Sequence, residues 1–150
     1  MPRLIAALMT AALLAACAPL RDGAPPSFYF AENQQKVLPD PSDPAAFEVF
    51  PYAGAGPRDY WCAAGEYVMR GLHRDPGTRV YLLAPLGESV RAPGRQSIRF
   101  TVAPDAELLR RAENLPEGGY GLSLTRIGEN WRAIHVGRDC EREILVPPFP

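Results

Sequence analysis

The chain has 150 residues, of which 47% are hydrophobic, so it is long enough for one domain with a modest apolar core. Its 16 basic and 17 acidic side chains give a formal net charge of −1, and the sequence contains no basic run interleaved with aromatic residues. Because binding to a phosphate backbone needs such a basic surface, the composition argues against a nucleic-acid-binding protein.

The first sixteen residues have the composition of a secretory signal peptide. Arg3 supplies a positive charge, and residues 4–16 form an uncharged apolar run. This run is too short for a transmembrane helix, which needs about 20 apolar residues. We therefore expect residues 1–16 to be a signal peptide that is removed on export.

The end of this segment, Leu14-Ala15-Ala16-Cys17, resembles the lipobox of bacterial lipoproteins. The resemblance covers the first seventeen residues and implies cleavage before Cys17, a diacylglycerol on its thiol and acylation of the new amino terminus. Several acyl chains, at about 0.8 kcal/mol per buried CH₂, anchor a domain more firmly than one. The absence of aspartate at position 18 further implies the outer membrane, facing the periplasm. Ordinary cleaved secretion and an uncleaved anchor remain the alternatives.

Residues 17–46 are rich in proline, which predicts a lipid-anchored, semi-rigid tether. One apolar patch, Phe28-Tyr29-Phe30, interrupts it. We interpret this patch as a segment docked at the edge of the domain, with contact to a membrane surface as the alternative. The folded domain is then expected over residues 47–150.

One principal helix is predicted over residues 59–72, with Pro57 suited to its first turn. Its apolar side chains recur at three- and four-residue steps along one side: Trp61, Ala64, Val68 and Leu72. Glu66 and Arg70 lie four residues apart and are expected to pair on the side that faces water.

Five segments have the apolar alternation of strands: residues 47–50, 78–84, 97–102, 120–127 and 131–136. We expect the second and third to pair, and the last two to form a hairpin through Gly128-Glu129-Asn130. A short helix is expected over residues 106–113. Together these elements predict an α+β fold, with one principal helix packed on a small, mainly antiparallel sheet.

The cysteine count predicts one disulfide. With Cys17 assigned to lipid, Cys62 and Cys140 remain as an even pair in an oxidising compartment. Closing a loop of this length would stabilise the fold by about 3–4 kcal/mol in the chain-entropy model. Two buried thiols, or one reactive thiol, remain the alternatives.

A reactive Cys62 would lie near a helix start, with His135 on a later predicted strand. That arrangement resembles the papain-like cell-wall peptidases and would make the protein a thiol hydrolase, with Asp139 as the candidate that orients the histidine. Those enzymes carry Asp-Cys-Ser-Gly around the nucleophile, whereas this chain has Trp61-Cys62-Ala63-Ala64. His73 and His135 have no metal-ligand spacing with each other or with the cysteines.

The sequence therefore favours a non-enzymatic envelope lipoprotein that acts as a binding or accessory module. Its expected partners are the membrane, through lipidated Cys17, and an envelope protein, and no metal or cofactor is expected. The thiol hydrolase using Cys62 and His135 is one alternative function. A structural or assembly partner in an envelope complex is the other.

Overall fold

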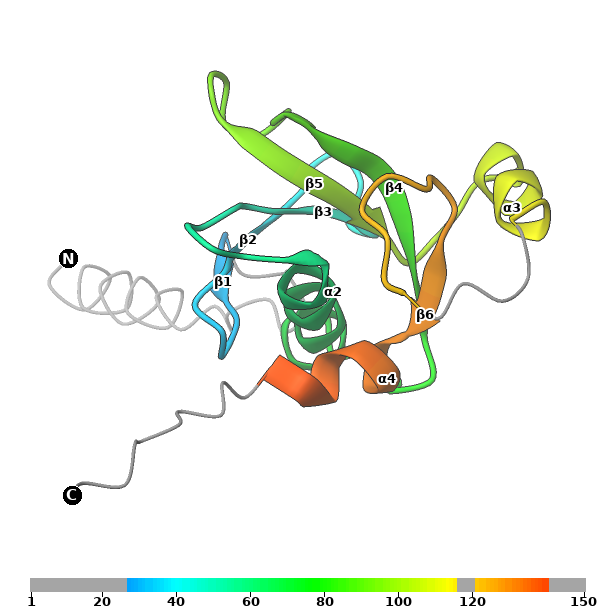
Figure 1. Ribbon diagram of the computed structural model, residues 1–150, viewed down its shortest axis with the longest axis horizontal. Helices are drawn as coiled ribbons and strands as arrows, with labels where there is room; N and C mark the ends of the chain where they lie inside the picture. The colour runs from blue at the N-terminus through cyan, green and yellow to red at the C-terminus, as the bar shows by residue number, and fades with distance from the viewer. Residues whose placement is uncertain (1–26, 116–120, 141–150) are drawn as a thin grey trace, which may run out of the picture.

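The computed structural model describes residues 27–115 and 121–140 and has an α+β fold (Figure 1). One six-stranded sheet has the strand order β1-β2-β3-β5-β4-β6, and all its neighbouring strands are antiparallel. The strands are β1 (Tyr29–Phe30), β2 (Lys36–Pro39), β3 (Ala46–Val49), β4 (Arg79–Glu88), β5 (Gln96–Thr101) and β6 (Asn130–Arg132). The helical elements are α2 (Pro57–Glu66), the π-helical turn η1 (Tyr67–Gly71), α3 (Ala106–Glu113), α4 (Ala133–Gly137) and the 3₁₀ turn η2 (Arg138–Cys140). The predicted fold class is confirmed.

The folded domain begins before residue 47, so the predicted tether of residues 17–46 was too long. Strands β1 and β2 belong to the sheet, and Val37 of β2 lies opposite Val49 of β3. Of the prolines that suggested a linker, Pro39 ends β2, and Pro41 and Pro44 lie in the turn into β3, where the Asp40 carboxylate accepts hydrogen bonds from Ser42. Residues 17–26, and with them Cys17, lie outside the described residues.

The predicted hairpin of residues 120–127 and 131–136 was also wrong. Residues 121–127 form bends and turns, because the Ser123 hydroxyl accepts hydrogen bonds from the backbone N–H groups of Thr125 and Arg126. The later segment gives only Trp131 and Arg132 to β6, which begins at Asn130 and pairs with β4. Helix α4 then starts at Ala133, so His135 lies on a helix and not on a strand.

Helix α2 lies between the sheet and α4 (Figure 1). It begins where Pro57 occupies the first turn and the Asp59 carboxylate accepts a hydrogen bond from the Gly56 N–H at 2.7 Å. From Tyr60 to Val68 every residue is buried. Its large side chains meet aromatic residues of the sheet, with the ring centres of Trp61 and Phe100 5.0 Å apart.

Small residues let α4 approach α2 closely. A Cβ atom placed on Gly65 would lie 2.7 Å from both the Ala133 carbonyl oxygen and the Gly137 nitrogen. A Cβ atom on Gly137 would lie 2.8 Å from the Glu66 nitrogen. These neighbours are backbone atoms, so neither glycine can carry a side chain unless the two helices move apart.

Glu66 does not face water as predicted. Its side chain is buried, and it accepts hydrogen bonds from the Tyr29 hydroxyl at 2.5 Å and from the Glu32 N–H at 2.9 Å. Arg70 is exposed and lies 3.6 Å from the same carboxylate, where it also pairs with Glu32. The predicted pair exists, but its acidic partner joins the β1–β2 hairpin to the helix.

Two tyrosines near Glu66 differ in their hydrogen bonding. Tyr29 donates to Glu66, and burial, followed by that hydrogen bond and the charge of Glu66, raises the pKa of Tyr29. Tyr67 is fully buried, and its hydroxyl has no hydrogen-bond partner among residues 27–115 and 121–140. Burial raises the pKa of Tyr67 to about 12.

We expect Gly65→Ala to lower the free energy of unfolding by about 1–3 kcal/mol, because overpacking against α4 outweighs the higher helix propensity of alanine. Urea denaturation would measure the change. Gly121→Ala is the control, since a Cβ atom there meets nothing within 4 Å. Equal stability of the two variants would contradict the close contact between α2 and α4.

We expect Tyr67→Phe to leave stability at pH 7 unchanged or slightly higher, because it removes a buried hydroxyl that has no partner in the described part of the chain. Tyr29→Phe should cost about 1–3 kcal/mol, because it removes a donor to buried Glu66. Urea denaturation at pH 7 compares the two variants, and a larger loss from Tyr67→Phe would contradict this assignment.

Tyr67→Phe should also change how stability depends on pH in the alkaline range. Burial raises the pKa of Tyr67 in the folded state, so between about pH 10 and pH 12 the phenol ionises more readily in the unfolded chain. This difference leaves the free energy of unfolding unaffected below about pH 10 and lowers it as the pH rises towards about 12. Tyr67→Phe should therefore make the decline in stability between these pH values shallower. A decline as steep as that of the wild type would mean that Tyr67 ionises equally well in both states.

Candidate functional site

Cys62 and Cys140 are joined by a disulfide, with their Cα atoms 5.2 Å apart. Cys62 lies on α2 and Cys140 ends η2, and both are buried. The bond therefore ties the end of the described chain to the central helix. The helix dipole lowers a thiol pKa most within the first turn of a helix. Because α2 starts at Pro57, Cys62 lies beyond that turn.

The predicted peptidase-like pair, Cys62 and His135, lacks the free thiol and the strand-borne histidine that the resemblance implies. The Cys62 sulfur is bonded to Cys140, and His135 is an exposed residue of helix α4. Asp139 lies in η2. Within the described residues no group of three or more His, Cys, Asp or Glu side chains is placed to hold a metal ion.

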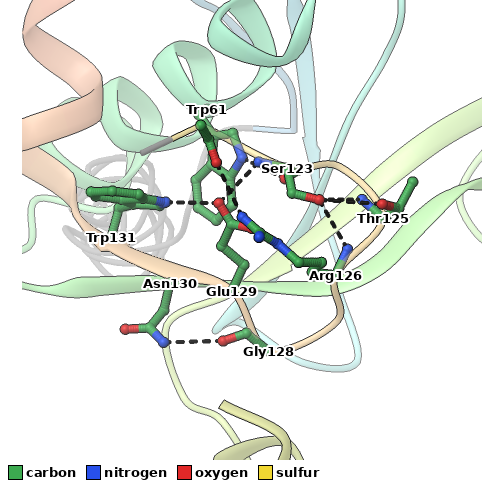
Figure 2. Close-up of polar contacts among 9 residues, drawn as sticks. Trp61, Ser123, Thr125, Arg126, Gly128, Glu129, Asn130 and Trp131 are labelled. Atoms are coloured by element: carbon green, nitrogen blue, oxygen red, sulfur yellow. Dashed lines mark hydrogen bonds and ion pairs between the residues drawn. The ribbon is translucent and has the colours of Figure 1, made fainter. Parts of the chain in front are cut away.

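Glu129 organises the loop formed by residues 121–128 (Figure 2). Its buried carboxylate accepts hydrogen bonds from the Ser123 N–H at 2.9 Å and the Trp131 indole at 3.1 Å, and it pairs with Arg126 at 2.8 Å. The indole of Trp61 donates to the Ser123 carbonyl oxygen at 2.8 Å. These contacts fix a segment of irregular backbone against the central helix.

Glu48 has a similar role in the connection between β4 and β5. Its buried side chain accepts hydrogen bonds from the Ser89 hydroxyl at 2.5 Å and from the Val90 N–H at 2.8 Å. Arg99 approaches the carboxylate to 4.0 Å. Glu48, Glu66 and Glu129 thus each bind the backbone of a loop, and their oxygen atoms are already occupied by donors of this chain.

An open groove of about 520 Å³ lies between α3 and the 121–128 loop. Its lining combines two apolar side chains with four charged ones: Leu115, Ile127, Glu107, Arg110, Arg111 and Arg126. Glu107 pairs with Arg111 at 3.0 Å and with Arg110. The hydrogen bond from Arg111 has the largest effect on the pKa of Glu107, and together with the hydrogen bond from Arg110 it lowers that pKa. An anionic group could bind these guanidinium groups only in competition with Glu107 and Glu129.

The sequence did not predict the groove, because its two walls are far apart along the chain and neither contains a recognisable motif. The only early signal was the amphipathic segment 106–113, which was correctly predicted as a helix. Each of the three arginines that line the groove, Arg110, Arg111 and Arg126, is paired with a carboxylate.

The chain matches no protein-family model, no curated protein and no solved structure. None of the helices within residues 27–115 and 121–140 has the length and hydropathy that a membrane span requires. Over residues 27–115 and 121–140 the geometry defines an α+β domain with a disulfide between Cys62 and Cys140 and an open groove beside α3.

Removing the disulfide should lower stability substantially. The bond links residues 78 apart, and closing such a loop stabilises by about 4.5 kcal/mol in the chain-entropy model. We expect Cys62→Ala with Cys140→Ala to lower the urea midpoint strongly, and dithiothreitol to do the same to the wild type. A reductant that leaves the wild-type midpoint unchanged would show that the bond does not form in solution.

Proposed function

We propose that this chain is an exported lipoprotein of the bacterial cell envelope whose domain is a non-catalytic binding or accessory module. The observation that carries the proposal is the lipobox-like sequence Leu14-Ala15-Ala16-Cys17 after an apolar run. The anchor is lipidated Cys17, and the expected location is the outer membrane, facing the periplasm.

The pairing of the other two cysteines supports export. Structural disulfides persist in oxidising compartments such as the periplasm and are rare in the cytosol. Cys62 and Cys140 lie in buried positions at disulfide distance, so they can form one there. Cys17 is then the one cysteine left over, as lipidation requires.

The thiol-hydrolase alternative is less well supported. It requires a reduced Cys62, because a disulfide sulfur is not a thiolate nucleophile. It also requires a histidine near that thiolate, whereas His135 is exposed on α4. A thiol that alkylates readily in the native protein, without reductant, would revive this alternative.

We assign ligand contact to the groove between α3 and the 121–128 loop. Binding sites combine a concave, partly apolar surface with a few polar groups, and this groove offers Leu115 and Ile127 beside three arginines. The alternative of an assembly partner in an envelope complex would use the same surface for a protein. Co-purification of a defined envelope protein after membrane solubilisation, lost in an Arg111→Glu variant, would favour that alternative.

The decisive experiment measures the intact mass of the protein extracted from the membranes of a bacterial host. Loss of residues 1–16 with an added mass of acyl groups supports the proposal, and Cys17→Ser should abolish both the added mass and membrane fractionation. Cys62→Ser is the matched control and should keep the lipid. An unmodified, cleaved chain in the soluble fraction would overturn the lipoprotein assignment.

A further inference from the structure

Two exposed phenylalanines lie side by side at the edge of the sheet. Phe28 and Phe30 are 51% and 56% exposed, and their rings contact each other edge to face with centroids 5.7 Å apart. Tyr29 between them points the other way, where it contacts Tyr67 and Glu66 in the interior. Phe30 of β1 and Phe28, the residue just before β1, therefore lie on the same outer face of this extended segment.

A positive charge completes this surface. Lys36, the only lysine of the chain, lies opposite Phe30 in the pairing of β1 with β2, and its ammonium group is 5.7 Å from the centre of the Phe28 ring. Glu32, on the same hairpin, is paired with Arg70. In the described part of the chain Lys36 itself makes no ion pair.

The position of this surface along the chain limits what it can meet. Phe28 comes eleven residues after Cys17, which at about 3.3–3.6 Å per residue allows at most roughly 40 Å between them. A domain of this size is itself about 30 Å across, so an anchored domain stays within about one diameter of the bilayer. β1 is the first described strand after the anchor.

We infer that Phe28, Phe30 and Lys36 form a membrane-contact surface that lies on the bilayer in which the Cys17 lipid is inserted. Aromatic side chains with a flanking cation suit the interface between anionic headgroups and acyl chains, where the rings leave water and the ammonium meets phosphate. This inference rests on the proposed lipid anchor. It gives the domain a fixed orientation, with β1 towards the bilayer and α3, at the other end of the molecule in Figure 1, away from it.

The test uses the mature lipidated protein, which begins at Cys17. It is reconstituted into vesicles of phosphatidylcholine with phosphatidylglycerol whose acyl chains are brominated, so that they quench tryptophan on contact. Phe30→Trp places a reporter in the surface, and Leu109→Trp places a matched reporter at an exposed site on α3. Both variants must match the wild-type circular dichroism and melting temperature. The emission of Trp61 and Trp131 is subtracted by using the wild type.

We expect the reporter at position 30 to lose at least twice as much emission as the reporter at position 109. Equal quenching of the two reporters, in protein that floats with the vesicles, overturns the membrane-contact surface and leaves the anchor standing. Protein that fails to float overturns the anchor and, with it, this inference. Emission at position 30 that changes with protein concentration but not with brominated lipid would show a second copy on the surface and also overturn it.

A charge variant tests the role of Lys36. Lys36→Glu in the Phe30→Trp background should reduce quenching in vesicles that contain phosphatidylglycerol and should have little effect in pure phosphatidylcholine. Lys36→Arg should restore the wild-type response. Unchanged quenching by Lys36→Glu in anionic vesicles overturns the electrostatic part of the inference.

Discussion

The structure depends on covering α2 on every side. A surface helix needs only one apolar face, but residues 60–68 are all buried, so the sheet alone cannot shield them. The β1–β2 hairpin, the 121–128 loop and α4 cover the remaining sides through Glu66, Trp61 and Gly65 respectively. Each of these segments is short, and each is positioned by the helix it covers.

Buried carboxylates fix several of the irregular segments of the domain. Glu48, Glu66 and Glu129 each accept hydrogen bonds from backbone N–H groups of a turn or loop, so the loops are fixed without joining a sheet. An ionised carboxylate in such a site is stabilised by several donors, which offsets much of its desolvation cost. The oxygen atoms of all three side chains are thereby occupied by donors of this chain.

The sequence predicted the elements whose periodicity is simple, and it failed where tertiary contacts override a local pattern. The central helix, α3 and the pairing of β4 with β5 follow from apolar spacing. The prolines near residue 40 suggested a tether because composition does not distinguish a linker from a turn between strands. Residues 131–136 alternate as a strand would, but the chain turns into helix α4 at Ala133, where Ala133 and Gly137 pack on Gly65. This packing requirement cannot be recognised in the local sequence. For the site, the cysteine count predicted the disulfide partners, whereas the groove joins distant segments and left no local signal.

The disulfide also changes how force would travel through the domain. Measured along the covalent chain, the route from Cys62 to the 121–128 loop is shorter through the sulfur atoms and back from Cys140 than through β4, β5 and α3. In the proposed lipoprotein, tension between the anchored amino terminus and a partner held at that loop would bypass these three elements. β4, β5 and α3 inside the covalent ring would carry none of this tension, whereas β6 and α4 lie on the loaded path. Extension would be confined to the segment before Cys62 and the dozen or so residues before Cys140.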